Sequence, residues 1–281
     1  MSAHSYPAPA KLNLLLRVVG RRADGYHLLQ TIFRFIDQGD EVRLQVREDG
    51  EIRRIRELPG VAMDDDLTVR AARLLKSATG TALGADIELS KRLPLGAGLG
   101  GGSSDAATVL LALNRLWATG LSRPDLQALG TRLGADVPVF VFGESALGEG
   151  IGDVLSPLSL PAAWYVVLTP GVSVATARIF SDPELKRDSK TIKIQGFSAG
   201  TPFNGENDLE PLVCRLYPEV AHHLEWLRQH GHASMTGSGS AVFASFESEA
   251  AARSVLAQLP ATMSGFVARG LDRHPLWALG Q

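Results

Sequence analysis

Residues 94–104 read P-L-G-A-G-L-G-G-G-S-S, and no other segment of the chain is as informative. Its glycines leave the backbone with almost no side-chain cover, so the loop can adopt positive φ angles and turn successive N–H groups toward an anion. The next residues, S-S-D-A-A-T-V-L-L-A-L-N-R-L-W, predict an amphipathic helix that Ser103 or Ser104 caps. A glycine-rich loop that opens onto a helix N-terminus is typical of a phosphate site. The sequence therefore predicts a protein that uses nucleotide phosphates.

Similar glycine motifs fit the surrounding sequence poorly. The loop satisfies the dinucleotide-binding spacing G-x-G-x-x-G, but that fold requires a strand after the helix that ends in an acidic residue. Residues 119–134 instead predict a second helix, in which Ser122 and Asp125 form a capping box. A Walker A loop is excluded because no lysine precedes Ser103. A plain flexible linker is the remaining alternative, and linkers seldom join a strand directly to a capped amphipathic helix.

The composition predicts a two-domain cytoplasmic protein. The chain has 281 residues, of which 45% are hydrophobic and 21% charged, as in ordinary globular cores. Its net charge of −2 provides no basic field, so neither nucleic acid nor a membrane is an expected partner. The single cysteine, Cys214, excludes intramolecular disulfides and is expected to be a buried structural thiol. Residues 1–10 lack the regions of a signal peptide, and because no patch predicts an interface, a homodimer stays open.

The first predicted domain, residues 1–155, is a mixed α+β unit. Residues 11–18 alternate as a strand with Lys11 and Asn13 on one face. Its apolar face consists of Leu12, Leu14, Leu16 and Val18. An Asp24-Gly25 pair signals a hairpin turn. Further strands are predicted at 28–36, 41–47 and 85–90, with a helix at 66–78 whose N-terminus the acidic run 64–66 serves.

The second predicted domain, residues 156–281, follows a glycine- and proline-rich boundary at 144–161. The residues W-Y-V-V-L-T-P predict a buried strand, and the polar, proline- and glycine-broken tract 181–208 predicts a mobile excursion. The remaining elements are predicted as a helix at 218–230, a strand at 241–246, a helix at 247–258 and a strand at 265–269.

Two further segments carry candidate chemistry. The second glycine cluster, M-T-G-S-G-S-A-V-F at 235–243, is either a β-turn at a domain edge or a loop that closes over the same phosphates. In G-A-D-V-P-V-F at 134–140, Asp136 precedes an apolar run, where a carboxylate serves either chemistry or a helix cap.

Taken together, the motifs resemble the GHMP kinase superfamily. Its three motifs match in order as P-A-K-L-N-L at 9–14, the loop at 94–104 and T-G-S-G-S-A at 236–241. The resemblance implies an α+β, two-domain fold with the active site and the phosphate loop in the cleft between the domains. Within the superfamily, the resemblance narrows to members that act on a cytidine diphosphate conjugate. The strings that carry it are K-L-N-L-L-L, R-R-A-D-G-Y-H-L-L-Q-T at 21–31, G-L-G-G-G-S-S-D-A-A and G-A-D-V-P-V-F.

The resemblance implies transfer of the ATP γ-phosphate to the 2-hydroxyl of a methylerythritol, with Mg²⁺, in non-mevalonate isoprenoid biosynthesis. Asp136 becomes the general base, and Lys11 keeps it ionised and stabilises the nascent alkoxide. The implied substrate-binding residues are Asn13, Tyr26, His27, Thr176 and Phe180. The implied ATP-binding residues are Lys91, Pro94, Leu95, Gly96, Ala97, Gly98, Leu99, Gly100, Gly101, Gly102, Ser103 and Ser104, with Thr236, Gly237, Ser238 and Gly239 on the phosphate side.

Two alternatives and one residue stay open at this stage. One alternative is a kinase for another alcohol, such as homoserine or a mevalonate derivative. Those substrates contain no nucleobase for the G-Y-H loop to bind. A nucleotide-binding sensor that lost catalysis would have no need of both Lys11 and Asp136. Asp105, directly after the loop, either assists Mg²⁺ or supports the helix N-terminus.

Overall fold

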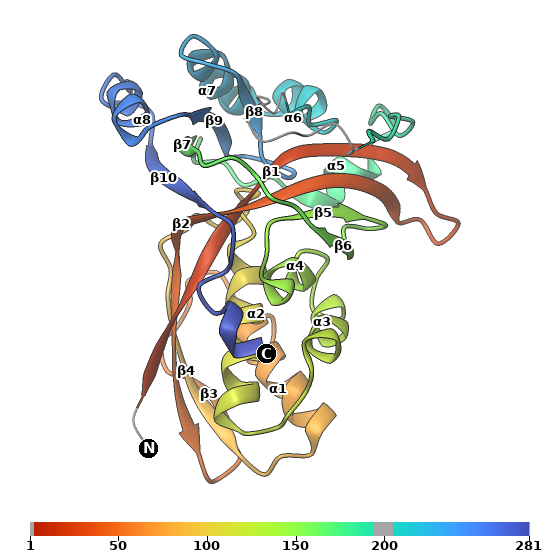
Figure 1. Ribbon diagram of the computed structural model, residues 1–281, viewed down its shortest axis with the longest axis vertical. Coiled ribbons are helices and arrows are strands. Elements are labelled where there is room, and N and C mark those ends of the chain that lie inside the picture. The colour runs from red at the N-terminus through yellow and green to blue at the C-terminus, as the bar shows by residue number, and fades with distance from the viewer. Residues whose placement is uncertain (1–2, 194–204, 281) are drawn as a thin grey trace.

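A computed structural model describes residues 3–193 and 205–280. Its strands form one ten-stranded sheet, in which the order β3-β4-β2-β10-β7-β9-β8 runs through both halves of the molecule (Figure 1). The strands are β1 (His4–Arg21), β2 (His27–Arg47), β3 (Ile52–Arg54), β4 (Gly84–Ser90), β5 (Ala146–Glu149), β6 (Val154–Pro157), β7 (Trp164–Leu168), β8 (Ala233–Met235), β9 (Val242–Phe246) and β10 (Gly265–Leu271). The helices are α1 (Leu67–Thr79), α2 (Gly101–Leu116), α3 (Arg123–Thr131), α4 (Val137–Phe142), α5 (Thr176–Ser181), α6 (Glu210–Leu216), α7 (Pro218–Arg228) and α8 (Glu249–Leu256), with a short 3₁₀ turn at Trp277–Gly280.

A long antiparallel hairpin of β1 and β2 runs through the molecule (Figure 1). The predicted Asp24-Gly25 turn is confirmed, since the strands pair up to Arg21 and His27 and Gly25 has φ +92°. The two strands predicted at 28–36 and 41–47 are one strand. Gly39 explains the error, because a Cβ there would lie 2.2 Å from the carbonyl oxygen of Ala8. The glycine therefore allows β1 and β2 to approach closely, and β2 continues through this position instead of ending there.

The predicted alternation of β1 holds only as far as Asn13. Lys11 and Asn13 share a face, as expected, but a β-bulge between Asn13 and Leu15 shifts the register against β2. Leu16 consequently lines the same cavity as Lys11 and Asn13, instead of lying opposite them. An extra residue in one strand exchanges the two faces from that point on, and no local sequence pattern marks it.

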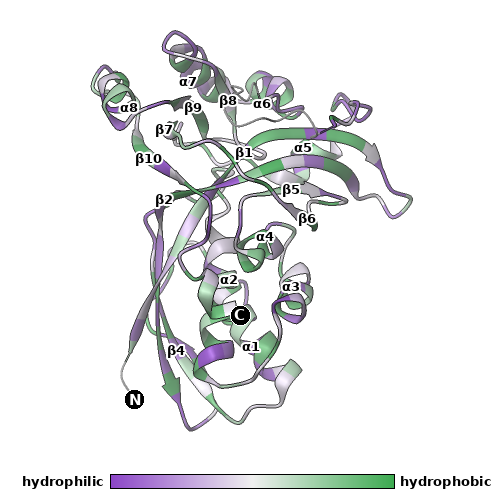
Figure 2. Ribbon diagram, viewed as in Figure 1, coloured by the Kyte–Doolittle hydropathy of each residue, from purple (hydrophilic) through white to green (hydrophobic). Residues whose placement is uncertain are grey.

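The first half places α1 and α2 against the strands β2 and β4 (Figure 1). Asp66 caps α1, as the acidic run predicted, because its carboxylate accepts from the backbone N–H of Thr68 at 2.9 Å. The predicted serine cap of α2 is wrong, since α2 begins at Gly101 and its N-cap is Gly100, which has no side chain. In Figure 2 α2 and the adjacent α4 are largely hydrophobic, which agrees with their burial in one core.

The second half packs α6, α7 and α8 on the strands β7 to β10. The predicted strands at 164–170 and 265–269 and the predicted helix at 218–230 are confirmed within a few residues at each end. The short elements α6, β3, β5, β6 and β8 have no sequence prediction, and β5 and β6 lie in the predicted boundary at 144–161. Residues 194–204 of the predicted excursion lie outside the described residues. The flanking residues 182–193 form no helix or strand.

The C-terminal residues return to the first half of the molecule. After β10, the backbone N–H of His274 donates to the carbonyl of Gly143 at 2.9 Å, and Trp277–Gly280 packs beside α2 and α4. Arg123 donates to the carbonyls of Val141 and Phe142, which satisfies the C-terminal end of α4. The division at residue 155 stays a prediction. In the described ranges, no helix has both the length and the apolar character to cross a bilayer.

Candidate functional site

A cavity of about 370 Å³ lies where β1, the glycine loop and residues 237–239 meet. It brings together most of the residues that the sequence implicated, from both predicted domains. Its predicted lining residues are Lys11, Asn13, Lys91, the loop residues 94–103, Asp136, Thr176, Phe180, Gly237, Ser238 and Gly239. Four others do not line it: Ser104 and Thr236 are fully buried, and Tyr26 and His27 line another cavity.

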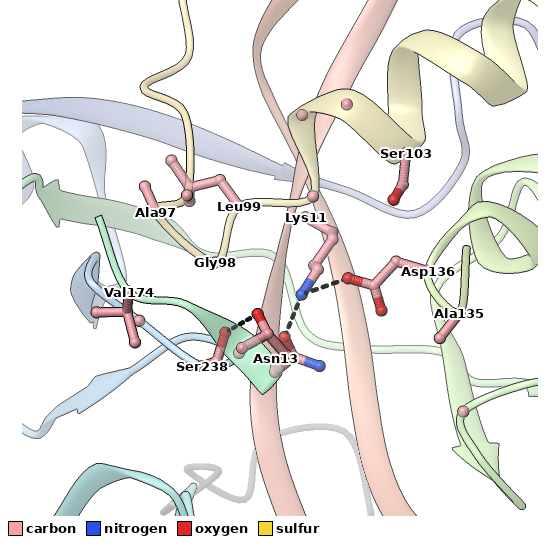
Figure 3. A pocket seen from close by; sticks show the side chains of 18 of the residues that line it. Lys11, Asn13, Ala97, Gly98, Leu99, Ser103, Ala135, Asp136, Val174 and Ser238 are labelled. Atoms are coloured by element: carbon pink, nitrogen blue, oxygen red, sulfur yellow. Dashed lines mark hydrogen bonds and ion pairs between the residues drawn. The ribbon is translucent and has the colours of Figure 1, made fainter. Parts of the chain in front are cut away.

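An ion pair joins the two predicted catalytic residues inside this cavity. Lys11 Nζ lies 3.2 Å from Asp136 Oδ2 and also donates to Asn13 Oδ1 at 2.5 Å (Figure 3). The lysine side chain is 2% exposed, whereas that of Asp136 is 37% exposed and opens into the cavity. Asp136 stands directly before α4, but its side chain makes no capping hydrogen bond. The carboxylate is therefore free of the helix and faces the ammonium.

The glycine loop is held by its carbonyls. The carbonyl oxygens of Gly96, Ala97 and Leu99 accept from the backbone N–H groups of Val174, Ala241 and Lys11 at 3.3, 3.0 and 3.0 Å, respectively. The loop can take this course because Gly96, Gly98 and Gly100 have φ between +65° and +74°. Because α2 has no side-chain cap, no N-cap side chain accepts a hydrogen bond from the backbone N–H groups of its first turn. The first turn of α2 therefore presents the positive end of a helix dipole, which can bind an anion.

The second glycine loop closes against the first. Thr236 Oγ1 accepts from the backbone N–H of Asn13 at 2.9 Å, and the hydroxyls of Thr176 and Ser238 lie 2.7 Å apart. Asn207, which sequence analysis missed, donates to the carbonyls of Met235 and Gly237 at 2.7 and 2.8 Å. It lies in a polar tract without a recognisable motif, so no sequence signal could have found it.

We expect Gly98→Ala to abolish tight ATP binding. A Cβ at residue 98 would lie 2.2 Å from the carbonyl oxygen of Thr236, and the backbone φ of +74° is strained for alanine. The two loops would have to separate, so Kd for ATP should rise by at least about tenfold, about 1.4 kcal/mol. Isothermal titration with a non-hydrolysable ATP analogue measures it. Gly60→Ala, at a positive φ with nothing nearby, is the matched control and should bind as the wild type does.

Lys91 is part of a buried cluster behind the loop. Its ammonium pairs with Asp40 and lies 3.0 Å from Asp105 Oδ2. Burial raises the pKa of the Asp105 carboxyl to about 7, and the charge of Lys91 only partly opposes that rise. Asp40 also accepts from the backbone N–H groups of Arg92 and Leu93 at 2.6 and 2.9 Å, so it anchors the start of the loop. Sequence analysis missed Asp40 because it stands in the segment D-Q-G-D, which predicted a break between strands.

A second cavity of about 500 Å³ adjoins the first and contains the predicted base-recognition residues. Tyr26 and His27 line it, and Phe180 lines both cavities. The rings of His27 and Phe180 lie 5.0 Å apart between centroids at an interplanar angle of 37°. Tyr26 is 61% exposed, as expected for an aromatic side chain at an open rim.

Acidic and metal-binding side chains are scarce around the described part of this cavity. Within residues 3–193 and 205–280, no cluster of three His, Cys, Asp or Glu side chains has the arrangement of a metal site. Among the residues that the structure describes, Asp136 is the only carboxylate that lines the first cavity, and it faces Lys11. Cys214 is half-buried instead of fully buried as predicted, and it is not among the described residues that line either cavity. Its pKa is raised to about 11, chiefly by burial, as expected for a structural thiol.

Family models and named relatives agree with this architecture. The GHMP kinases N terminal domain matches residues 66–144, and GHMP kinases C terminal matches residues 190–265. The 4-diphosphocytidyl-2-C-methyl-D-erythritol kinase of Thiobacillus denitrificans is 64% identical over 275 residues, which cover 98% of this chain and 98% of that protein. The protein of the same name from Nitrosospira multiformis is 59% identical over 275 residues, 97% of this chain and 92% of the relative.

Solved structures show the same fold. A crystal structure of 4-(cytidine 5'-diphospho)-2C-methyl-D-erythritol kinase has a TM-score of 0.77 at 36% identity, over 95% of this chain and 99% of that chain. Homoserine kinase from Cytophaga hutchinsonii has a TM-score of 0.70 at 20% identity, over 97% and 96%, which shows a shared fold alone. The predicted α+β fold and the resemblance to GHMP kinases are thus confirmed. The chain belongs to the GHMP kinase family and is an ATP-dependent kinase.

Proposed function

We propose that the protein transfers the γ-phosphate of ATP to the 2-hydroxyl of 4-diphosphocytidyl-2-C-methyl-D-erythritol. The observation that carries the proposal is the Lys11–Asp136 pair at 3.2 Å, which lines the glycine-lined cavity, and the cavity of Tyr26, His27 and Phe180 adjoins it. One cavity fits nucleotide phosphates and the other fits a pyrimidine. The names of the most similar relatives support the same substrate.

Asp136 is proposed as the general base. Its carboxylate is partly exposed in the cavity and can accept the proton of the acceptor hydroxyl as the oxygen attacks phosphorus. Lys11 contacts this carboxylate and would stabilise negative charge on the attacking oxygen. Because the ammonium is also bound by Asn13 and is almost fully buried, it is oriented before the substrate arrives.

The loop and the first turn of α2 are proposed to bind the triphosphate. Backbone N–H groups at a helix N-terminus stabilise phosphate oxygens, and Gly237 and Ser238 border the same cavity from the opposite side. Lys91 is proposed to act through the loop, because Asp40 and Asp105 already bind its ammonium.

The donor set fits Mg²⁺ carried by ATP. Mg²⁺ prefers oxygen ligands and commonly binds through substrate phosphates with few protein ligands. Ser103, on the first turn of α2, offers a hydroxyl in the cavity near the phosphate loop (Figure 3). When bound, the cation would neutralise charge on the phosphates. Asp105 is directed to Lys91, which favours its structural role over a metal-binding one.

The decisive experiment compares acceptors. ATP-dependent ADP release is measured with 4-diphosphocytidyl-2-C-methyl-D-erythritol, with homoserine, mevalonate and galactose as controls. Turnover confined to the cytidyl substrate supports the proposal. Turnover with another alcohol retains the kinase mechanism but overturns the role of the G-Y-H loop. ATP binding without any turnover favours a sensor that lost catalysis.

A second prediction concerns base recognition. His27→Ala should raise KM for the cytidyl substrate by at least about tenfold with little change in kcat, because the ring contacts the base and not the reacting atoms. Steady-state kinetics at saturating ATP measure both constants. His230→Ala is the matched histidine control, because His230 packs on Trp226 and is not among the residues that line either cavity. An unchanged KM would move base recognition away from His27.

A further inference from the structure

One arginine outside the predicted site contacts the base-recognition histidine. Arg187 Nε donates a hydrogen bond to His27 Nε2 at 3.0 Å. A guanidinium carries only donors and stays protonated, so Nε2 must supply its lone pair. A neutral imidazole has one protonated nitrogen, and the proton of His27 therefore lies on Nδ1.

The surroundings of His27 act in the same direction. Burial, followed by the positive charges of Arg187 and Arg21, lowers the pKa of the His27 ring below its usual value. An imidazolium would need protons on both nitrogens and would lose the hydrogen bond from Arg187. The contact thus favours one protonation state and one tautomer.

Arg187 is itself held in place. Its Nη2 donates to the carbonyls of Phe180 and Asp182 at 3.0 and 2.7 Å, and its Nη1 donates to that of Leu185 at 2.8 Å. These carbonyls belong to the end of α5 and the turn that follows it. Phe180 also packs against His27. The Arg187 guanidinium therefore contacts both residues whose rings line the base cavity, His27 through its ring and Phe180 through its carbonyl.

The tautomer has a consequence for base selection. Cytosine and uracil differ at N3, which is a lone-pair acceptor in cytosine and an N–H donor in uracil. A histidine ring with its only N–H on Nδ1, and with Nε2 already occupied, can give a hydrogen bond to cytosine N3 but cannot receive one from uracil N3. A site whose donors and acceptors match one ligand discriminates strongly against an analogue that lacks the matching groups.

We propose that Arg187 is a specificity-determining positioning residue, which holds His27 as a hydrogen-bond donor and thereby favours cytosine over uracil. The inference deepens the proposed function and rests on it. Removing Arg187 frees the ring to exchange tautomers, so the preference between the two bases should fall while both still fit the cavity.

The test compares affinities for CDP and UDP, with the ATP site saturated by a non-hydrolysable ATP analogue. The wild type should favour CDP, and Arg187→Met should reduce the ratio of the two dissociation constants by about tenfold or more. A ratio is insensitive to partial unfolding, because unfolded molecules reduce binding of both ligands equally. Arg215→Met is the matched control. Arg215 pairs with Glu184, which lies in the same segment as Arg187, and the hydrogen bond to His27 comes from Arg187. The ratio for Arg215→Met should equal that of the wild type.

A spectroscopic measurement tests the tautomer directly. In ¹⁵N-histidine NMR of the ligand-free protein, His27 should show a protonated Nδ1 and an unprotonated Nε2, and Arg187→Met should show averaging between the two. The His27→Ala spectrum assigns the resonances. A protonated Nε2 in the wild type would overturn the inference.

The outcomes separate the inference from the proposed function. Turnover of the cytidyl substrate with an unchanged CDP-to-UDP ratio in Arg187→Met contradicts the inference alone. A preference for CDP that Arg187→Met loses, in a protein without turnover, contradicts the proposed function alone. A wild type that binds neither nucleotide at this cavity overturns both.

Discussion

Asp136→Asn is expected to lower kcat by about 10²–10⁴-fold, the range typical of removing a general base. Asparagine keeps the size of the side chain but cannot accept the hydroxyl proton as a carboxylate does. The carboxylate is partly exposed and makes no capping bond, so the substitution should leave α4 and the fold intact. Steady-state turnover of the cytidyl substrate measures kcat, and titration with an ATP analogue measures nucleotide affinity.

Nucleotide affinity separates this role from a structural one. The ATP analogue should bind Asp136→Asn within about twofold of the wild type, because the phosphates are proposed to be held by backbone N–H groups. Asp65→Asn, at an exposed aspartate before α1, is the matched control and should keep full kcat. A loss of ATP affinity as large as the loss of kcat would show that Asp136 serves binding instead of proton transfer.

Lys11→Met is expected to lower kcat by about 10²–10³-fold, as for the loss of one preorganised donor to a developing negative charge. Methionine approximates the length of lysine and fills the buried space without the charge. Because Asp136 is 37% exposed, water can solvate its carboxylate once the lysine charge is removed, so thermal stability should change little. Differential scanning calorimetry beside steady-state kinetics measures the two effects separately.

A double substitution tests whether the two residues act together. If Lys11 and Asp136 serve the same proton transfer, Lys11→Met with Asp136→Asn should lose little more activity than the worse single variant. Fully multiplicative losses would show that they act independently. A fall in kcat that merely followed a fall in Tm would contradict the catalytic role of Lys11.

Much of the site could be predicted from the sequence because its signals are local. The loop at 94–104 needs positive φ at closely spaced positions, which glycine alone adopts without strain, and three of these glycines do so. Asp66 and the Ser122–Asp125 box cap their helices through contacts two or three residues apart. Such contacts are encoded where they occur, so they need no knowledge of the fold.

Several predictions failed where a distant segment decided the outcome. Gly39 lets β2 continue because it packs on the backbone of Ala8, and the bulge after Asn13 depends on the register against β2. The serine cap predicted for α2 was wrong because Gly100 already takes the left-handed conformation at that position. The first two cases depend on packing between segments far apart in the chain, whereas the cap depends on the backbone conformation of Gly100.

Local sequence patterns were enough to predict the glycine loop, the strand face that carries Lys11 and Asn13, the hairpin turn and the family. Long-range packing was needed to bring Asp40 to Lys91 and to the backbone N–H of Arg92 at the start of the loop. It also brings Arg187 to a histidine 160 residues earlier in the chain. The physical reason is the range of the interactions. Backbone torsions and helix caps are fixed by neighbouring residues, whereas a buried charge or a histidine tautomer depends on whichever partner the packed fold brings within hydrogen-bond distance.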